Sequence, residues 1–83
     1  MTRNQLLEEA RRRPFRPFRL VLTTGEQYDI PHPDLIMVGN RSLEIGLTLD
    51  PAGTAYDRIV RADLLHVVRV EQLPISAQSN GSP

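Results

Sequence analysis

The stretch FRLVLTTGEQYDI, residues 18–30, decides the fold class of this 83-residue chain. From Phe18 to Leu22 every second residue is a large apolar one, and this period of two is typical of a strand with one buried face. Thr24-Gly25 follows as a turn, and EQYDI, residues 26–30, repeats the alternation on the return. Residues 18–30 therefore predict a β-hairpin.

The same period continues toward the C-terminus. Four further stretches are expected to be short strands, namely LIMV (35–38), SLEIGLTL (42–49), AYDRIV (55–60) and HVVRVEQL (66–73). SLEIGLTL is the clearest of them, and its internal glycine, Gly46, predicts strong curvature or a β-bulge. Leu43, Ile45, Leu47 and Leu49 are expected to point inward from it.

Turn signals separate these stretches. PHPD, residues 31–34, predicts a strand edge or a sharp bend, because proline cannot donate to a ladder and holds its preceding residue extended. Gly39-Asn40 and DPAG, residues 50–53, predict turns. Ala62–Leu65 predicts one tight helical turn capped by Asp63 before the last strand.

The N-terminal segment has the pattern of a helix instead. Thr2-x-x-Gln5 fits a capping box, and two glutamates precede two arginines by four residues, which favours i,i+4 ion pairs. Pro14 disfavours helical geometry at the residue before it, so we expect the helix over residues 3–13. The prediction is a mainly β domain over residues 1–73, in which this helix precedes a small bent SH3- or Sm-like barrel of five to six strands (18–73). Residues 74–83 are expected to be a disordered tail.

Composition excludes several function classes. The chain has no cysteine, which excludes disulfides, zinc thiolates and thiol nucleophiles. No apolar run approaches the roughly 20 residues that cross a bilayer, and no signal-peptide pattern is present, so we expect a cytoplasmic protein without membrane contact. The net charge is zero, whereas dedicated nucleic-acid binders are usually basic. Its distribution is uneven, because residues 1–19 carry six Arg against two Glu and residues 20–83 carry four Arg against eight acids.

RRRPFRPFR, residues 11–19, is the strongest electrostatic feature of the chain. Its arginines are candidate contacts for a nucleic acid or a protein partner: Arg11, Arg12, Arg13, Arg16 and Arg19. In the other interpretation the segment is a hinge, in which Phe15 and Phe18 pack the helix over one end of the barrel and the arginines stay on the rim. The zero net charge favours the hinge.

His32 and Asp34 form a weaker candidate site. They offer two metal ligands or an acid–base pair, but x-Pro-His-Pro-Asp is also typical of a rigid turn, which we favour. No G-x-S-x-G, phosphate-binding glycine loop or H-E-x-x-H motif is present. We therefore expect no enzyme activity, no resident metal and no cofactor.

Residues 11–34 and 59–71, RRRPFRPFRLVLTTGEQYDIPHPD and IVRADLLHVVRVE, resemble a group of short uncharacterised bacterial proteins. These share an R-P-F-x-P-F stretch, a glycine hairpin, an H-P-[DE] step and a hydrophobic strand near the C-terminus. No activity is established for that group, so the resemblance implies no function.

The chain also resembles the Sm-like fold of the Hfq and Lsm proteins. Residues 18–25 are similar to its first strand and turn, Asp34-x-x-Met37 to part of its first signature, and VRADLLHVV (60–68) to its second. The resemblance implies a ring-forming protein that binds single-stranded RNA in its pore, with Arg61 as a tentative contact. Ala62 stands where the family has Gly or His, and Val38 replaces the Asn of the RNA pocket.

The leading functional prediction is a non-enzymatic interaction module that self-associates, or docks a protein partner, through unpaired strand edges. SLEIGLTL and HVVRVEQL are the candidate edges. The alternative is Sm-like RNA binding through residues 11–19 and Arg61.

Overall fold

The structure is a computed structural model, and it describes residues 1–49 and 56–73. One α-helix, six strands and two short 3-10 helices follow one another in this part of the chain. In order they are α1 (Arg3–Ala10), β1 (Phe18–Leu22), β2 (Gln27–Ile30), η1 (Pro33–Leu35), β3 (Ile36–Val38), β4 (Ser42–Leu47), β5 (Arg58–Asp63), η2 (Leu64–His66) and β6 (Val67–Gln72). The predicted mainly β fold with one N-terminal helix is confirmed. The turn expected at residues 50–53 and the tail expected at 74–83 lie outside the described residues.

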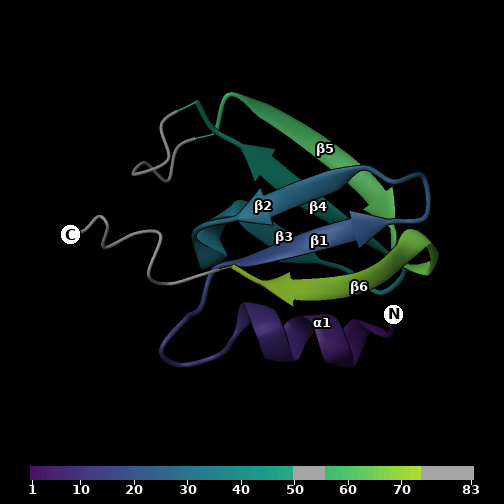
Figure 1. The fold of residues 1–83 in the computed structure, drawn as a ribbon, viewed down its shortest axis with the longest axis horizontal. Helices are drawn as coiled ribbons and strands as arrows, with labels where there is room; N and C mark the ends of the chain where they lie inside the picture. The colour runs from purple at the N-terminus through teal and green to yellow at the C-terminus, as the bar shows by residue number, and fades with distance from the viewer. Residues whose placement is uncertain (50–55, 74–83) are drawn as a thin grey trace.

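The strands form two three-stranded antiparallel sheets (Figure 1). Sheet A has the order β2-β1-β6 and sheet B the order β3-β4-β5, so β1 and β4 are the central strands. Across residues 1–49 and 56–73 no strand pairing joins the two sheets into a closed barrel. The fold established here is therefore a pair of small sheets.

Two tight turns carry the chain between the sheets. η1 follows β2 and leads into β3, which confirms that residues 31–34 bend the chain. η2 joins β5 to β6, and the Asp63 side chain accepts a hydrogen bond from the Leu65 amide (3.2 Å). The predicted capped turn before the last strand is thereby confirmed, although its helical residues are 64–66.

The core is aliphatic apart from Phe18. Both sheets and the helix contribute completely buried side chains to it: Leu6, Phe18, Leu20, Ile30 and Ile45. Val21 points to the opposite face of β1 and is nevertheless buried, as suits a central strand. The inward position predicted for Leu49 is wrong, since β4 ends at Leu47 and the Leu49 side chain is 90% exposed.

The helix is shorter than predicted. The capping box is present, with Gln5 N donating to the Thr2 hydroxyl (3.2 Å) and Thr2 N donating to the Gln5 side chain (3.0 Å). Helical geometry ends at Ala10, three residues before Arg13, as the approach to Pro14 demands an extended backbone. The predicted Glu–Arg pairs therefore do not form on a continuous helix, and the Glu9 carboxylate instead accepts from the Gln72 side chain (2.9 Å). Among the described residues, no helix has both the length and the apolar character that a membrane crossing requires.

Gly46 has a different role from the predicted one. The registers of β4 with β3 and with β5 run without a shift, so there is no bulge at this glycine. A Cβ atom at residue 46 would lie only 2.9 Å from the Tyr56 Cβ and 3.3 Å from the Leu35 Cδ2. Glycine is present here because the Tyr56 side chain packs directly against the strand.

Candidate interaction site

The aromatic residues of the segment 11–19 are structural. Phe18 is completely buried in the core, and its ring centroid lies 5.9 Å from that of Phe15 in a tilted arrangement. Leu73 N also donates to the Pro17 carbonyl (3.1 Å), which ties the end of β6 to the segment before β1. These contacts hold the connection between α1 and β1, as the hinge interpretation predicts.

The arginines of this segment divide into two groups. The side chains of four of them are exposed and form no ion pair or hydrogen bond with other described residues, namely those of Arg11, Arg12, Arg13 and Arg16. Arg19, in contrast, donates twice to the Asp29 carboxylate, through Nε (2.7 Å) and through NH2 (3.3 Å). The hydrogen bond and the charge of Asp29 raise the pKa of Arg19. The Arg19 side chain is thus paired with a carboxylate of its own sheet.

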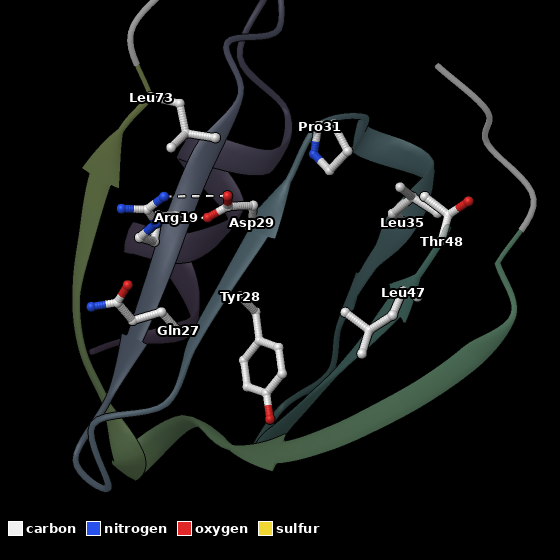
Figure 2. A pocket seen from close by; sticks show the side chains of 10 residues that line it. Arg19, Gln27, Tyr28, Asp29, Pro31, Leu35, Leu47, Thr48 and Leu73 are labelled. Carbon is white, nitrogen blue, oxygen red and sulfur yellow. Dashed lines mark hydrogen bonds and ion pairs between the residues drawn. The ribbon is translucent and has the colours of Figure 1, made fainter. Parts of the chain in front are cut away.

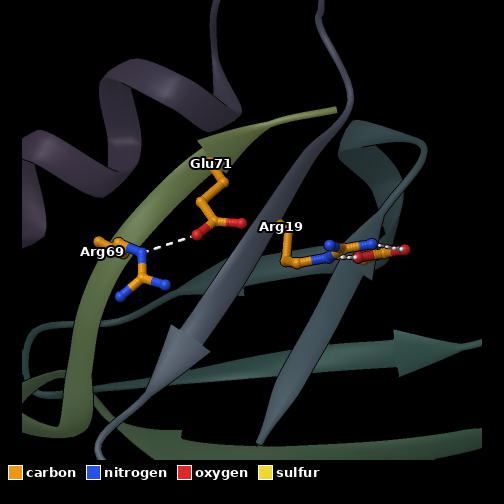
Figure 3. A network of polar contacts seen from close by, with 4 residues as sticks. Arg19, Arg69 and Glu71 are labelled. Carbon is orange, nitrogen blue, oxygen red and sulfur yellow. Dashed lines mark hydrogen bonds and ion pairs between the residues drawn. The ribbon is translucent and has the colours of Figure 1, made fainter. Parts of the chain in front are cut away.

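The ion pair of Arg19 belongs to a row of charges across the outer face of sheet A (Figure 3). In the strand register Arg19 lies between Asp29 on β2 and Glu71 on β6. Glu71 in turn accepts from Arg69 Nε (2.7 Å). These charged side chains on the outer face of sheet A are therefore paired with one another.

Arg61, the residue that the Sm-like resemblance singles out, lies on β5 in sheet B. Its guanidinium forms an ion pair with Glu44 on the neighbouring strand β4 (Nε to Oε2, 3.1 Å). Its side chain is nevertheless 71% exposed. The structure puts Arg61 on a different element from the arginines of residues 11–19.

His32 and Asp34 do not form an acid–base pair here. No hydrogen bond joins them, the Asp34 side chain is exposed in η1, and the buried Nε2 of His32 lacks a hydrogen-bond partner among the described residues. In the same part of the chain, no three His, Asp or Glu side chains are grouped as metal ligands. This arrangement fits the rigid turn that we favoured.

Sequence reasoning missed an open cleft between the sheets, because only the tertiary arrangement creates it. The cleft has a volume of about 600 Å³ and lies between β2 and the end of β4. Tyr28 and Leu47 extend into it from opposite sheets, while the Arg19–Asp29 pair lies at its edge (Figure 2). Desolvation, together with a hydrogen bond from the phenol to Glu26 (3.2 Å), raises the pKa of Tyr28.

Among the described residues, no strand pairs with the outer edge of β5. Leu64 N donates to the Arg41 carbonyl (2.8 Å), and these two residues continue the pairing of β4 with β5 by one position. The bond therefore shows which residues of β5 form hydrogen bonds with β4. Antiparallel strands alternate, so Val60 exchanges hydrogen bonds with β4, whereas Ile59 and Arg61 direct N–H and C=O groups away from it. β5 therefore offers a template for another strand.

Exposed apolar side chains accompany this edge on the outer face of sheet B. We call Met37, Tyr56 and Ile59 the sheet B patch; they are 63%, 56% and 51% exposed. Together with Gly46 they line a small hollow of about 100 Å³. Sheet B thus exposes a cluster of apolar side chains to solvent, whereas sheet A exposes Val68 on β6.

The two edges proposed from sequence differ from this one. SLEIGLTL forms β4, which pairs on both sides and is not an edge. HVVRVEQL forms β6, an edge of sheet A that lies beside α1 (Figure 1). Hydrogen bonds join the two elements near both ends, from the Met1 amino group to the Val67 carbonyl (3.2 Å) and from Gln72 to Glu9.

Comparison with protein-family models, with curated proteins and with solved structures finds no significant match for this chain. The two sequence resemblances therefore stay predictions, and the function has to be argued from the surfaces described above.

Proposed function

We propose that this protein is a non-enzymatic interaction module with an SH3- or Sm-like small barrel, and that it self-associates through the free edge of β5. The barrel assignment is supported by chain order: β2 of one sheet and β3 of the other follow one another directly through η1. A 3-10 turn before the last strand and a helix before the first agree with the same plan.

The non-enzymatic part of the proposal rests on the chemistry of the inter-sheet cleft. The ionisable groups that line the inter-sheet cleft are Arg19, Asp29 and Tyr28. The first two neutralise each other, and the raised pKa of Tyr28 keeps its phenol protonated near neutral pH, where it is no base. The cleft therefore supplies no activated nucleophile or general base.

The free edge of β5, bordered by the sheet B patch, is the observation that carries the self-association. An exposed edge with an apolar side chain such as Ile59 tends to pair with another strand unless charges or proline protect it. A second copy of β5 would satisfy the backbone groups of Ile59 and Arg61 and cover the apolar side chains beside them. The zero net charge keeps electrostatic repulsion between copies small.

The test compares two lysine variants by light scattering coupled to size-exclusion chromatography. Ile59 on β5 and Val68 on β6 are both 51% exposed, so they form a matched pair. Wild-type protein should elute with a multiple of the monomer mass. Ile59→Lys should yield monomer, because it puts a charge into the proposed contact, while Val68→Lys should keep the wild-type mass.

A strictly monomeric wild-type protein at every concentration would refute self-association. Equal loss of mass in the two lysine variants would refute the assignment to β5. Circular dichroism of each variant establishes that the fold is retained, as expected for substitutions at half-exposed positions.

A further inference from the structure

A second surface lies between α1 and β3. It is a groove of about 480 Å³, and we call it the α1–β3 groove. Its apolar lining comes from Leu7 on the helix and from Ile36 and Val38 on β3, with the exposed Met37 at its margin. Methionine adapts its shape readily and is frequent at binding surfaces. The aliphatic side chains of the groove therefore suit contact with an apolar side chain of another molecule.

Charged side chains border this floor unevenly. Arg11 and Arg13 line it from the end of the helix and the hinge, and Asp34 lines it from η1. All three are exposed, and none has an ion-pair partner among the described residues. The groove thus carries two guanidinium groups against one carboxylate.

Three of the four arginines on the strands are different. Arg19, Arg61 and Arg69 each hold a carboxylate on the same strand or on a neighbouring one. Arg11 and Arg13 border the groove and form no ion pair with a described residue, although Asp34 lines the same groove. Charge complementarity therefore calls for an anionic partner that also brings an apolar side chain.

We propose that the α1–β3 groove binds an acidic peptide segment. Two carboxylates of the segment meet Arg11 and Arg13, where charge-assisted hydrogen bonds to guanidinium are strong, and an aliphatic side chain between them covers Leu7, Ile36 and Val38. The groove shares Met37 with the sheet B patch, but its arginines lie at the end of the helix and in the hinge, away from the β5 edge, so the inference does not rest on self-association.

Several observations favour a peptide over RNA. Single-stranded nucleic acid is bound by stacking its bases on aromatic rings, but the groove is lined by aliphatic side chains and Phe15 packs on Phe18. The zero net charge of the chain lowers its attraction for a polyanion further.

The experiment measures fluorescence anisotropy of a labelled peptide of alternating glutamate and leucine, at about 50 mM salt, where surface ion pairs are least screened. The double variant Arg11→Gln/Arg13→Gln should weaken binding about tenfold, a loss equivalent to about 1.4 kcal/mol. The matched control, Arg12→Gln/Arg16→Gln, removes the same charge from exposed arginines that do not line the groove, and should change the affinity less than about twofold.

Three results would overturn the proposal. Equal losses in the two double variants would mean that the peptide responds only to overall charge. Equal binding of a glutamine–leucine peptide would mean that the carboxylates are not recognised. Tighter binding of a single-stranded RNA that is lost in Arg11→Gln/Arg13→Gln would assign the groove to nucleic acid instead.

Discussion

The outer faces of the two sheets are built from different chemistry. On sheet A, Arg19 and Asp29 pair across adjacent strands, and Arg69 pairs with Glu71 on a third. On sheet B one ion pair, Glu44–Arg61, lies among the apolar side chains of the sheet B patch. The charged side chains of sheet A are therefore paired with one another, and among the large apolar side chains on its described strands only Val68 is exposed. Sheet B instead leaves a cluster of apolar side chains in contact with water.

The residues that stabilise the fold therefore lie in a different place from those that are free to contact another molecule. The side chains that hold the fold together lie between the sheets and under the helix, and both sheets contribute to that layer. The outer face of sheet B contributes little to it, so its apolar residues are free to serve a contact with another molecule. Three comparisons between pairs of variants test whether the regions of the molecule differ in this way.

The largest effect is expected for Phe18→Ala. Phe18 is completely buried and contacts the hinge through Phe15, so its truncation should lower the free energy of unfolding by about 3–5 kcal/mol. Ile59→Ala on sheet B should cost less than about 0.5 kcal/mol in the monomer, since surface substitutions rarely cost more. Urea denaturation at a concentration where the protein is monomeric measures both. Similar losses would contradict the division between core and outer face.

A smaller effect is expected for Gly46→Ala. The added Cβ would come within 2.9 Å of the Tyr56 Cβ, an atom that a rotamer change cannot move away, so we expect a loss of about 1–3 kcal/mol. Gly25→Ala in the turn of sheet A meets no atom within 4 Å, but its backbone has a φ of +92°, and this change should cost a similar amount for a different reason.

A double-mutant cycle tells the two glycine effects apart. In a Tyr56→Gly background the cost of Gly46→Ala should largely disappear, because the clashing atom is gone, whereas the cost of Gly25→Ala should stay unchanged. Urea denaturation of wild-type protein, the three single variants and the two double variants supplies the numbers. A Gly46→Ala cost that persists without the Tyr56 side chain would show that packing against Tyr56 is not the reason for this glycine.

The smallest effect is expected for the charged face. Asp29→Asn removes the carboxylate held by Arg19 and should cost less than about 1 kcal/mol at low salt, as both partners are partly exposed. Glu44→Gln on sheet B should cost less still, because Arg61 is more exposed than Arg19. Denaturation repeated at about 1 M salt should erase both differences by screening. A loss for Asp29→Asn that is insensitive to salt would contradict an electrostatic origin.

Local pattern accounted for most of the secondary structure. The alternation from Phe18, the capping box at Thr2 and the turn capped by Asp63 were all predicted correctly, since each depends on neighbouring residues alone. The bulge predicted at Gly46 and the free edge proposed for residues 42–49 were wrong, because each depended on residues elsewhere in the chain. The role of Gly46 depended on Tyr56, which lies ten residues away in sequence, and the pairing of β4 on both sides could not be seen in its own alternation.

The candidate site divides in the same way. The arginines of residues 11–19 were identified from sequence, but charge pattern could not show that Asp29 holds Arg19 or that Arg11 and Arg13 line a groove with β3. The inter-sheet cleft and the sheet B patch gave no signal in the sequence. Each is made of residues from two or more strands.

The order of residues by itself determined where strands, turns and the helix form, because hydrophobic period, capping and proline geometry act over a few residues. The tertiary structure alone decided which strand has a free edge, which arginines lack a counter-charge and which apolar side chains face water. Those properties depend on distances between segments far apart in the chain, and such distances exist only once the two sheets and the helix have packed together.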